Sequence, residues 1–284
     1  MTETKIRSWL FAPGDSERKL AKVASCGADQ VIVDLEDAVA PENKARARSL
    51  AAEWLGDHPG MWVRINPVGG DLWQDDLATI MPARPAGIVL PKAAGPADVA
   101  RLAQALAQME GEDAATGILP LVSETAAAAL AIPTYATDVP PRLLGLTWGA
   151  EDLSAALGAT RKRDDRGAWT DAFRMIRAQL LLTAHAAGVA PIDTLFGDFH
   201  DLAGLARTAA ASFADGFAGM LAIHPDQVPV INAAYSPTAE QVAEARAIIA
   251  AFAGDPGAGA VKLDGRMLDQ PHLALARRLL DRLG

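Results

Sequence analysis

The chain has 284 residues, half of them hydrophobic (50%), so it is long enough to bury a large core. Its net charge of −9, with no segment that concentrates lysine and arginine, argues against a nucleic-acid or anionic-membrane partner. The single cysteine, Cys26, excludes an internal disulfide, and no apolar run reaches the length of a membrane span. Together with an N-terminus that lacks a signal-peptide pattern, these features predict a soluble cytoplasmic protein.

Short apolar segments bounded by turn residues recur along the chain, and such segments are typical of buried parallel strands. The predicted strands are 6–12, 30–35, 61–66, 87–90, 117–122, 143–147, 189–192 and 217–223. Helical patterns alternate with them, for example over 41–55, 96–109 and 238–253. The first of these begins at a proline, and the last begins with residues that are typical of a helix N-terminus. This alternation predicts an α/β fold, a (β/α)8 TIM barrel.

The end of the chain differs from the alternating part. Residues 254–260 read GDPGAGA and predict a linker, and the tail after it has its own turn and an apolar-faced helix. We therefore divide the chain into a catalytic barrel over 1–253 and a linker with a helical C-terminal extension over 254–284. Because the barrel is complete before the tail begins, we expect the tail to pack elsewhere, for example on a neighbouring subunit.

Two successive predicted strands are each followed by a carboxylate and an alanine-rich helical pattern. Glu124 and Asp152 thereby occupy equivalent positions past the carboxyl ends of strands 117–122 and 143–147. Ligands bind at that edge of parallel β/α proteins. Two oxygen donors with no histidine or cysteine beside them suit Mg²⁺ held together with waters and substrate oxygens. The alternative is that each acid only caps its helix, and the repetition favours the metal interpretation.

The other predicted strand ends add polar side chains to the same mouth. They are Asp34, Glu36, Asp37, Arg64, Lys92, Trp148, Glu151, Asp193 and His224. Acids that can hold a divalent cation beside cations that can hold an anion suit a chelating, negatively charged substrate such as a 2-oxo acid. The chain has no GxGxxG between a strand and a helix, no GxxxxGK[ST] and no serine nucleophile elbow, so dinucleotide, P-loop and serine-hydrolase functions lack support.

These segments carry a resemblance to a known family. The stretch 7–48, RSWLFAPGDSERKLAKVASCGADQVIVDLEDAVAPENKARAR, resembles the start of the citrate lyase β-subunit and malyl-CoA lyase family of the HpcH/HpaI aldolase superfamily. Matching motifs follow in the same order: VRINP, VLPKA, LVSETAAA, GLTWGAEDLSAALGA and GFAGMLAIHPDQV. The match covers roughly residues 6–235, and LDGRMLDQPHLALA in the tail resembles the family's C-terminal segment. Each motif alone is weak, whereas their combination is specific.

The resemblance implies a TIM barrel that cleaves or forms a carbon–carbon bond in a 3-hydroxyacyl thioester, usually of CoA, giving a 2-oxo acid and an acetyl-CoA-type product. Glu124 and Asp152 match the two carboxylate ligands of Mg²⁺, and Arg64 matches an arginine that contacts oxo-acid or thioester oxygens. The competing role for Arg64 is a salt bridge to the acids after strand 30–35. The resemblance also implies a homotrimer or hexamer.

The remaining candidates each have two interpretations. Asp37 either holds the metal's waters and orients Arg64, or caps the next helix. Lys92 either pairs with these acids or reaches substrate, and Arg18 either meets CoA phosphates or lies on a solvated helix face. Asp269 resembles an acid that some family members present to a neighbour's active site, but it lies in a turn that is equally suited to the surface. The candidate sets are therefore catalytic Arg64, Asp37 and Asp269; substrate-binding Arg64, Glu124, Lys92 and Arg18; and metal-binding Glu124 and Asp152.

Four functions other than a stand-alone CoA lyase stay open. A related enzyme can hydrolyse the thioester, run in the synthase direction, or act on a thioester borne by a carrier protein within a larger citrate lyase complex. A metal-dependent aldolase on free 2-oxo acids shares the barrel and the acidic ligands. A non-catalytic binding module is disfavoured by the presence of Arg64, Glu124 and Asp152. Malyl, citramalyl, methylmalyl and citryl thioesters are not distinguished by these residues.

Overall fold

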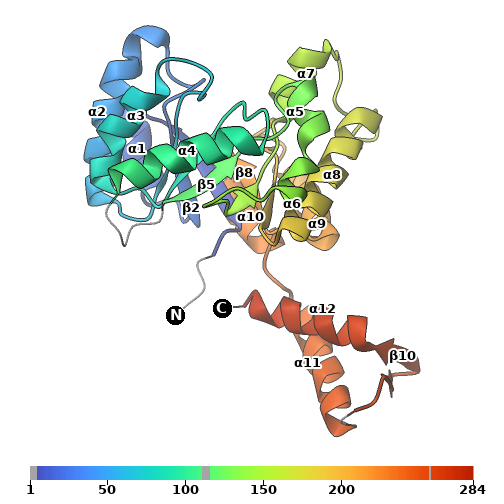
Figure 1. Cartoon of the computed structure of the whole chain (residues 1–284). Coiled ribbons are helices and arrows are strands. Elements are labelled where there is room, and N and C mark those ends of the chain that lie inside the picture. Colours follow the sequence, from blue (N-terminus) through green and yellow to red (C-terminus); the bar gives the residue numbers. More distant parts are fainter. Residues whose placement is uncertain (1–4, 111–115, 256, 284) are drawn as a thin grey trace.

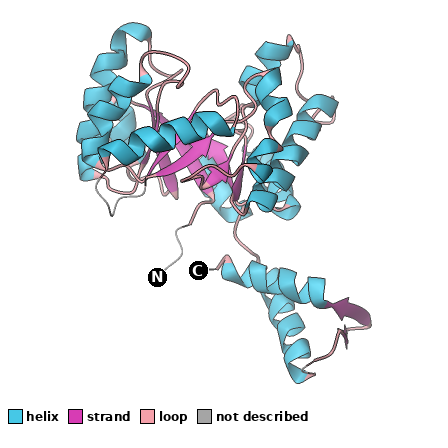
Figure 2. Ribbon diagram, viewed as in Figure 1, coloured by secondary structure: helices cyan, strands magenta, loops and turns pink. Residues whose placement is uncertain are grey.

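The computed structural model describes residues 5–110, 116–255 and 257–283. Its centre is a parallel sheet surrounded by helices, as Figures 1 and 2 show. The strands are β1 (Ser8–Pro13), β2 (Gln30–Asp34), β3 (Trp62–Arg64), β4 (Gly87–Leu90), β5 (Gly117–Pro120), β6 (Gly145–Leu146), β7 (Ala190–Asp193) and β8 (Gly219–Ala222). Each strand coincides with a segment that the apolar pattern predicts, with differences only at the ends.

The sheet closes into a barrel. Hydrogen-bonded neighbours run in the order β5-β4-β3-β2-β1-β8-β7-β6, and every pair is parallel. Parallel bridges from Ile118 to Leu143 and from Leu121 to Thr147 join the two outer strands of this order. The predicted TIM barrel is confirmed, so the carboxyl ends of all eight strands open on one mouth.

The barrel interior is filled by apolar side chains that alternate with those facing the helices. Its members are Trp9, Ile32, Trp62, Val89, Leu119, Leu121, Ile192 and Leu221. Trp9 and Trp62 meet edge to face, with ring centroids 4.9 Å apart. A Cβ on Gly87 would lie 2.2 Å from the Trp62 ring, so the glycine on β4 leaves the space that this indole occupies.

Helices cover the outside of the barrel. In chain order they are α1 (Glu17–Val23), the 3-10 turn η1 (Pro41–Asn43), α2 (Lys44–Asp57), α3 (Trp73–Ile80), the 3-10 turn η2 (Met81–Ala83), α4 (Pro96–Met109), α5 (Ala126–Ala131), α6 (Thr134–Thr137), α7 (Ala150–Leu157), α8 (Asp171–Ala187), α9 (Leu202–Asp215) and α10 (Gln227–Ala234). The sequence pattern does not predict α10, because Pro229 and β-branched residues weaken its helical signal. In the segment of the chain that the structure describes, no helix is long and apolar enough to cross a membrane.

The chain ends in a separate unit, visible below the barrel in Figure 1. It consists of α11 (Ala239–Gly254), the antiparallel pair β9 (Ala260–Leu263) and β10 (Arg266–Asp269), and α12 (Gln270–Asp281). The capping box of Thr238 and Gln241 begins α11 where the sequence predicts a helix start. The tail contains a β-hairpin where only a turn was expected.

The helix α11 belongs to this C-terminal unit by its contacts. Its buried residues form one small core with the tail: Ala245, Ile248, Phe252, Leu268, Leu273 and Ala276. A boundary near Ser236–Pro237 therefore fits the contacts better than the predicted boundary after residue 253, because the apolar face of α11 is covered by α12 and not by the barrel. Within the predicted linker 254–260, residue 256 lies outside the described residues.

Candidate active site at the mouth of the barrel

The last residues of β2 and β3 form a buried ion pair at the mouth. Asp34 and Arg64 lie opposite each other in the strand register. The Arg64 Nε and Nη2 atoms donate to the two carboxylate oxygens of Asp34 at 2.7 and 2.6 Å, and Nη1 lies 2.9 Å from Oε2 of Glu36. The guanidinium also lies over the Phe11 ring, 4.8 Å from its centre. The ion-pairing role considered for Arg64 is thus present in the structure.

This ion pair keeps Arg64 charged. Burial lowers the pKa of Arg64, but the hydrogen bond and charge of Asp34, with the charge of Glu36, raise it above the usual value overall. The hydrogen bonds to Asp34 engage two of the five guanidinium N–H groups, whereas Oε2 of Glu36, although close, accepts no hydrogen bond among the described residues. The other N–H groups belong to a fork that Asp34 holds in place, so they can meet a substrate oxygen without reorganisation.

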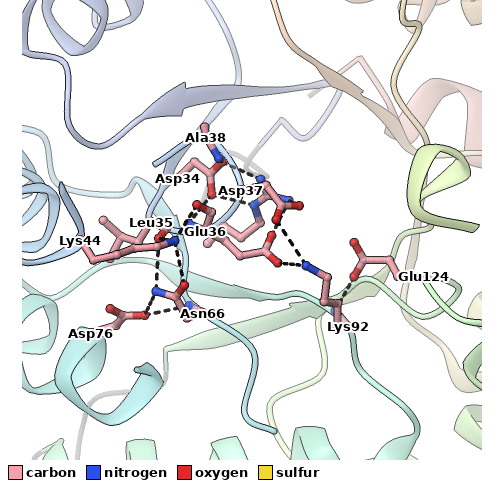
Figure 3. A network of polar contacts seen from close by, with 11 residues as sticks. Asp34, Leu35, Glu36, Asp37, Ala38, Lys44, Asn66, Asp76, Lys92 and Glu124 are labelled. Atoms are coloured by element: carbon pink, nitrogen blue, oxygen red, sulfur yellow. Dashed lines mark hydrogen bonds and ion pairs between the residues drawn. The ribbon is translucent and has the colours of Figure 1, made fainter. Parts of the chain in front are cut away.

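Lys92 joins these acids to the next carboxylate around the mouth (Figure 3). It follows β4 and has a φ of 52°, a left-handed conformation that is uncommon outside glycine. Its ammonium donates to Glu36 and lies 3.3 Å from Oδ1 of Asp37, while its backbone N–H donates to Oε2 of Glu124. Burial lowers the pKa of Lys92, but the hydrogen bond and charge of Glu36 raise it overall. Lys92 thus pairs with these acids, and its contact with a substrate stays a prediction.

Neither Glu36 nor Asp37 caps a helix, since Ala40 is the N-cap of η1. Glu36 is buried, at 3% exposed, and burial raises its pKa against the opposing charges of Arg64 and Lys92. Asp37 has a side chain that is 53% exposed. Of the acids after β2, Asp37 is thus the one that a substrate or a metal-bound water can reach.

Glu124 presents a carboxylate oxygen that the protein does not satisfy. Its side chain is buried, at 3% exposed, and Oε1 has no hydrogen-bond partner among the described residues. Burial raises the pKa of Glu124 to about 8; the backbone N–H of Lys92 opposes this, and the charge of Asp152 adds to it. The capping interpretation of Glu124 is wrong, because Thr125 is the N-cap of α5 and accepts from the Ala128 N–H.

Asp152 lies in the first turn of α7, whose N-cap is Gly149, and its charge acts on the Glu124 carboxylate. The capping interpretation of Asp152 is therefore also wrong. A Cβ on Gly149 would lie 3.1 Å from Cγ and 3.5 Å from Oε1 of Glu124, so the glycine backbone lies directly against that carboxylate. The Gly149 N–H donates to Ser123 Oγ at 3.1 Å and joins the ends of β5 and β6. These contacts place the start of α7, which carries Asp152, beside the Glu124 carboxylate.

A magnesium ion fits this pair. A buried carboxylate oxygen with no protein partner is unfavourable unless a cation or a proton meets it. Among the described residues, no group of three or more His, Cys, Asp or Glu is arranged to hold a metal. Mg²⁺ typically binds through one or two carboxylates and keeps several waters, so Glu124 and Asp152 suffice as its protein ligands.

Replacing Gly149 by alanine is expected to weaken Mg²⁺ binding about tenfold, because the new methyl group would displace the Glu124 carboxylate. Isothermal titration of the purified variant with Mg²⁺ measures the effect. Gly69→Ala is the matched control, since no atom lies within 4 Å of a Cβ built there. Equal affinities in the two variants would show that the space beside Glu124 is not needed.

A second layer of polar residues, which the sequence analysis does not assign, supports the turn after β2 (Figure 3). Lys44 Nζ donates to the carbonyls of Leu35 and Glu36, each at 2.7 Å, and to Asn66 Oδ1 at 2.9 Å. Asn66 in turn donates to Asp76 at 2.7 Å. Lys44 and Asn66 stand within the matching motifs PENKARAR and VRINP, but that position was the only signal that could have identified them.

The side chain of one strand-end residue, Asp193, does not face the mouth. Asp193 accepts from Trp148 Nε1 at 2.8 Å, from Ser212 Oγ and from Arg177 Nε at 2.9 Å, so it faces the helices. The expectation that Asp193 lines the mouth is wrong, because Ile192 before it fills the barrel interior and successive side chains of a strand alternate. His224, which follows β8, stacks with Phe199, with ring centroids 5.1 Å apart.

Among the described residues, no hydrogen bond or ion pair links the last two candidates, Arg18 and Asp269, to these groups. Arg18 is exposed on α1. Asp269 is the N-cap of α12 and forms a capping box with His272. Residues that precede β1, β7 and β8 line one cavity with the end of α12, so the C-terminal unit adjoins the face opposite the mouth. Asp269 therefore does not take part in the site of its own chain.

Comparison with known proteins gives consistent matches along the chain. A sequence model of the family described as HpcH/HpaI aldolase/citrate lyase matches residues 7–225. The citrate lyase subunit beta-like protein of Mycobacterium tuberculosis is 37% identical over 97% of this chain and 95% of its own length. The mitochondrial citramalyl-CoA lyase of Rattus norvegicus is 32% identical over 96% and 85%. The crystal structure of CitE from M. tuberculosis with magnesium, acetoacetate and coenzyme A superposes with a TM-score of 0.80 at 34% identity, covering 98% of both chains.

Proposed function

Because the chain belongs to the HpcH/HpaI aldolase/citrate lyase family, we propose that it is a Mg²⁺-dependent lyase of 3-hydroxyacyl-CoA thioesters. It cleaves, or in reverse forms, the bond between a 2-oxo acid and an acetyl-CoA-type product. The observation that carries the proposal is the unsatisfied Oε1 of Glu124 beside Asp152, at a mouth that also holds Arg64 and Lys92. A cation site next to fixed positive charge suits a chelating anionic substrate.

In the cleavage direction, a base removes the proton of the 3-hydroxyl group. The C2–C3 bond then breaks, the hydroxyl carbon becomes the ketone of the 2-oxo acid, and the electron pair forms the enolate of the acetyl thioester. Glu124 and Asp152 would hold Mg²⁺, which supplies Lewis-acid stabilisation when bound. The N–H groups of Arg64 that Asp34 does not engage would donate to the enolate oxygen, where a preorganised cation lowers the barrier most.

The other residues of the mouth hold these groups in place. Asp34 and Glu36 fix the Arg64 fork through the contacts described above. Asp37, which is half exposed, is placed to accept hydrogen bonds from metal-bound waters, and its carboxylate is 4.0 Å from Arg64 Nη1. Lys92 and Arg18 are the proposed contacts to the anionic parts of the substrate, Lys92 at the mouth and Arg18 on α1.

The test is product release from malyl-, citramalyl- and citryl-CoA, each with Mg²⁺ and with EDTA. Mg²⁺-dependent formation of acetyl-CoA and a 2-oxo acid from one of them supports the lyase and names the acyl group. Turnover that is unaffected by EDTA contradicts the metal assignment. If none of the three thioesters reacts, the substrate class is wrong, and free 2-oxo acids and carrier-bound thioesters are the next to assay.

The same assay distinguishes the alternatives. A thioesterase releases free CoA, a synthase consumes acetyl-CoA and a 2-oxo acid, and an aldolase turns over free oxo acids without CoA. A subunit of a larger complex would act only on a citryl-carrier protein. The mouth described here provides the chelating core that all of these share, so the products decide among them.

We also propose that the protein assembles as a homotrimer or hexamer in the cytoplasm, with the C-terminal unit against a neighbour. Asp269 is exposed at the start of α12, in a unit whose other end adjoins the face opposite the mouth, so a catalytic role requires a second subunit. Light scattering after size-exclusion chromatography measures the assembly, and a monomer at assay concentrations would contradict it.

Asp269→Asn is expected to lower activity about a hundredfold, because it removes the carboxylate but keeps a good N-cap for α12. This variant can be mixed with an equal amount of Glu124→Gln, and the chains dissociated and reassembled. Random assortment should then restore activity at about a quarter of the sites, because half of the mouths keep Glu124 and half of their neighbours keep Asp269. The mixture then contains mouths with both residues intact. Full activity of Asp269→Asn alone, or no recovery in the mixture, would contradict a shared site.

A further inference from the structure

A second cleft lies among helices on the outside of the barrel. It is bordered by the 158–170 segment and by α8 and α9, and it has a volume of about 570 Å³. Its charged lining residues are Arg163, Arg166, Arg174, Arg177, Arg207, Asp201 and Asp215. A local excess of arginine is unexpected in a chain whose net charge is −9. The cleft shares no lining residue with the mouth.

The two acids of the cleft are already engaged. Asp215 pairs with Arg177 at 2.7 Å, and Asp201 caps α9 by accepting from the Gly204 N–H at 2.8 Å. Arg174 pairs with Asp171. Within the described residues, no carboxylate lies at ion-pairing distance from the other three cleft arginines, which are Arg163, Arg166 and Arg207.

Arg163 has no carboxylate partner among the described residues, but other contacts hold its side chain in a fixed position. Its guanidinium lies 3.7 Å from the centre of the Trp169 ring and 5.9 Å from that of Phe196, and its Nη1 donates to the Gly167 carbonyl at 2.7 Å. Burial lowers the pKa of Arg163. The negative charge of Asp193 raises this pKa in part, and the positive charge of Arg177 lowers it further. Stacking between rings preorganises a guanidinium, so its remaining N–H groups are available to a ligand at little entropic cost.

We propose that this cleft binds a small anion with two or more negative charges, carried on phosphate or carboxylate groups. Guanidinium groups pair bidentately with carboxylates and phosphates, and several arginines around one space favour a ligand that carries more than one such group. The volume falls within the range of about 300–1,000 Å³ that small-molecule sites occupy. The site is independent of the lyase reaction proposed above, because it uses none of the residues at the mouth.

The experiment is isothermal titration of the full chain with pyrophosphate and with citrate, in EDTA and at constant ionic strength. We expect one site per chain for at least one of the two anions. Affinity should fall at least about tenfold in Arg163→Gln and further in Arg163→Gln/Arg207→Gln, because each loses charged hydrogen bonds. Arg246→Gln, an exposed arginine on α11, is the control and should bind as the parent does.

Each outcome decides the proposal. A preference for pyrophosphate assigns a phosphorylated ligand, and a preference for citrate assigns a polycarboxylate; both support the site. Absence of binding by either anion overturns it, as does binding that the double variant retains, since the anion would then occupy the mouth. If Arg163→Gln fails to fold, Arg207→Glu replaces it, because that side chain is exposed and reversal of its charge should abolish binding.

Discussion

Glu124→Gln and Asp152→Asn are each expected to lower Mg²⁺-dependent cleavage by about 10³-fold or more. Both substitutions keep the shape of the side chain and remove a negative charge from the proposed cation site. A divalent ion contributes several kcal/mol to a reaction of this type, and a tenfold loss of rate corresponds to about 1.4 kcal/mol. Rates with the preferred thioester measure the loss of cleavage, and Mg²⁺ titration of the same preparations measures the loss of metal affinity.

The folded state should not suffer from the Glu124 substitution. In the absence of a metal, burial disfavours the charged carboxylate, so a neutral amide at this position relieves a cost. We expect the free energy of unfolding of metal-free Glu124→Gln to equal or exceed that of the parent. Glu53→Gln, an exposed glutamate on α2, is the control for both measurements. Retention of activity and of Mg²⁺ affinity in Glu124→Gln would remove the basis of the metal site.

Arg64→Gln is expected to lower the free energy of unfolding by about 3–5 kcal/mol, besides reducing activity. The substitution leaves Asp34 and Glu36 buried, at 1% and 3% exposed, without their main counter-charge. Urea denaturation with a common slope measures the loss. Arg46→Gln is the control, because Arg46 makes an exposed pair with Glu17 at 3.7 Å and should change stability by less than about 1 kcal/mol.

A double-mutant cycle separates the ion pair from the other contacts of Arg64. Asp34→Asn/Arg64→Gln should recover part of the stability lost in Arg64→Gln, because the main uncompensated charge is then absent. Arg64→Lys keeps the charge but cannot bind both Asp34 oxygens, so its stability should lie between parent and Arg64→Gln. A loss below about 1 kcal/mol in Arg64→Gln would contradict the buried network as a main support of the mouth.

Much of this structure follows from local patterns in the sequence. The apolar runs place every strand of the barrel, and the alternation with helices identifies its architecture. Strand position alone also selects Glu124, Asp152, Arg64 and Lys92 as neighbours of the mouth. These predictions succeed because parallel strands in a barrel have one common direction, so a residue just after a strand is at the same edge as every other such residue.

Other features depend on contacts that the local pattern does not contain. The helix α11 was assigned to the barrel, but its apolar face is covered by α12, and an amphipathic pattern does not identify its partner. Asp193, like Glu124, comes at the end of a predicted strand. Its side chain points to the helices, because Ile192 before it points into the barrel and successive side chains of a strand alternate. Lys44 and Asn66, which both donate to the Leu35 carbonyl after β2, belong to segments that meet only after folding.

The sequence by itself thus determined the barrel, the family and the set of charged residues around one mouth. Only the tertiary structure decided what each charge faces: that Arg64 is held by Asp34, that Lys92 bridges Glu36 and Glu124, and that Glu124 keeps an oxygen free. The physical reason is that periodicity specifies the direction of a side chain relative to its own strand or helix. Its partner and its desolvation are set by residues far away in the chain, which become neighbours only when the barrel closes.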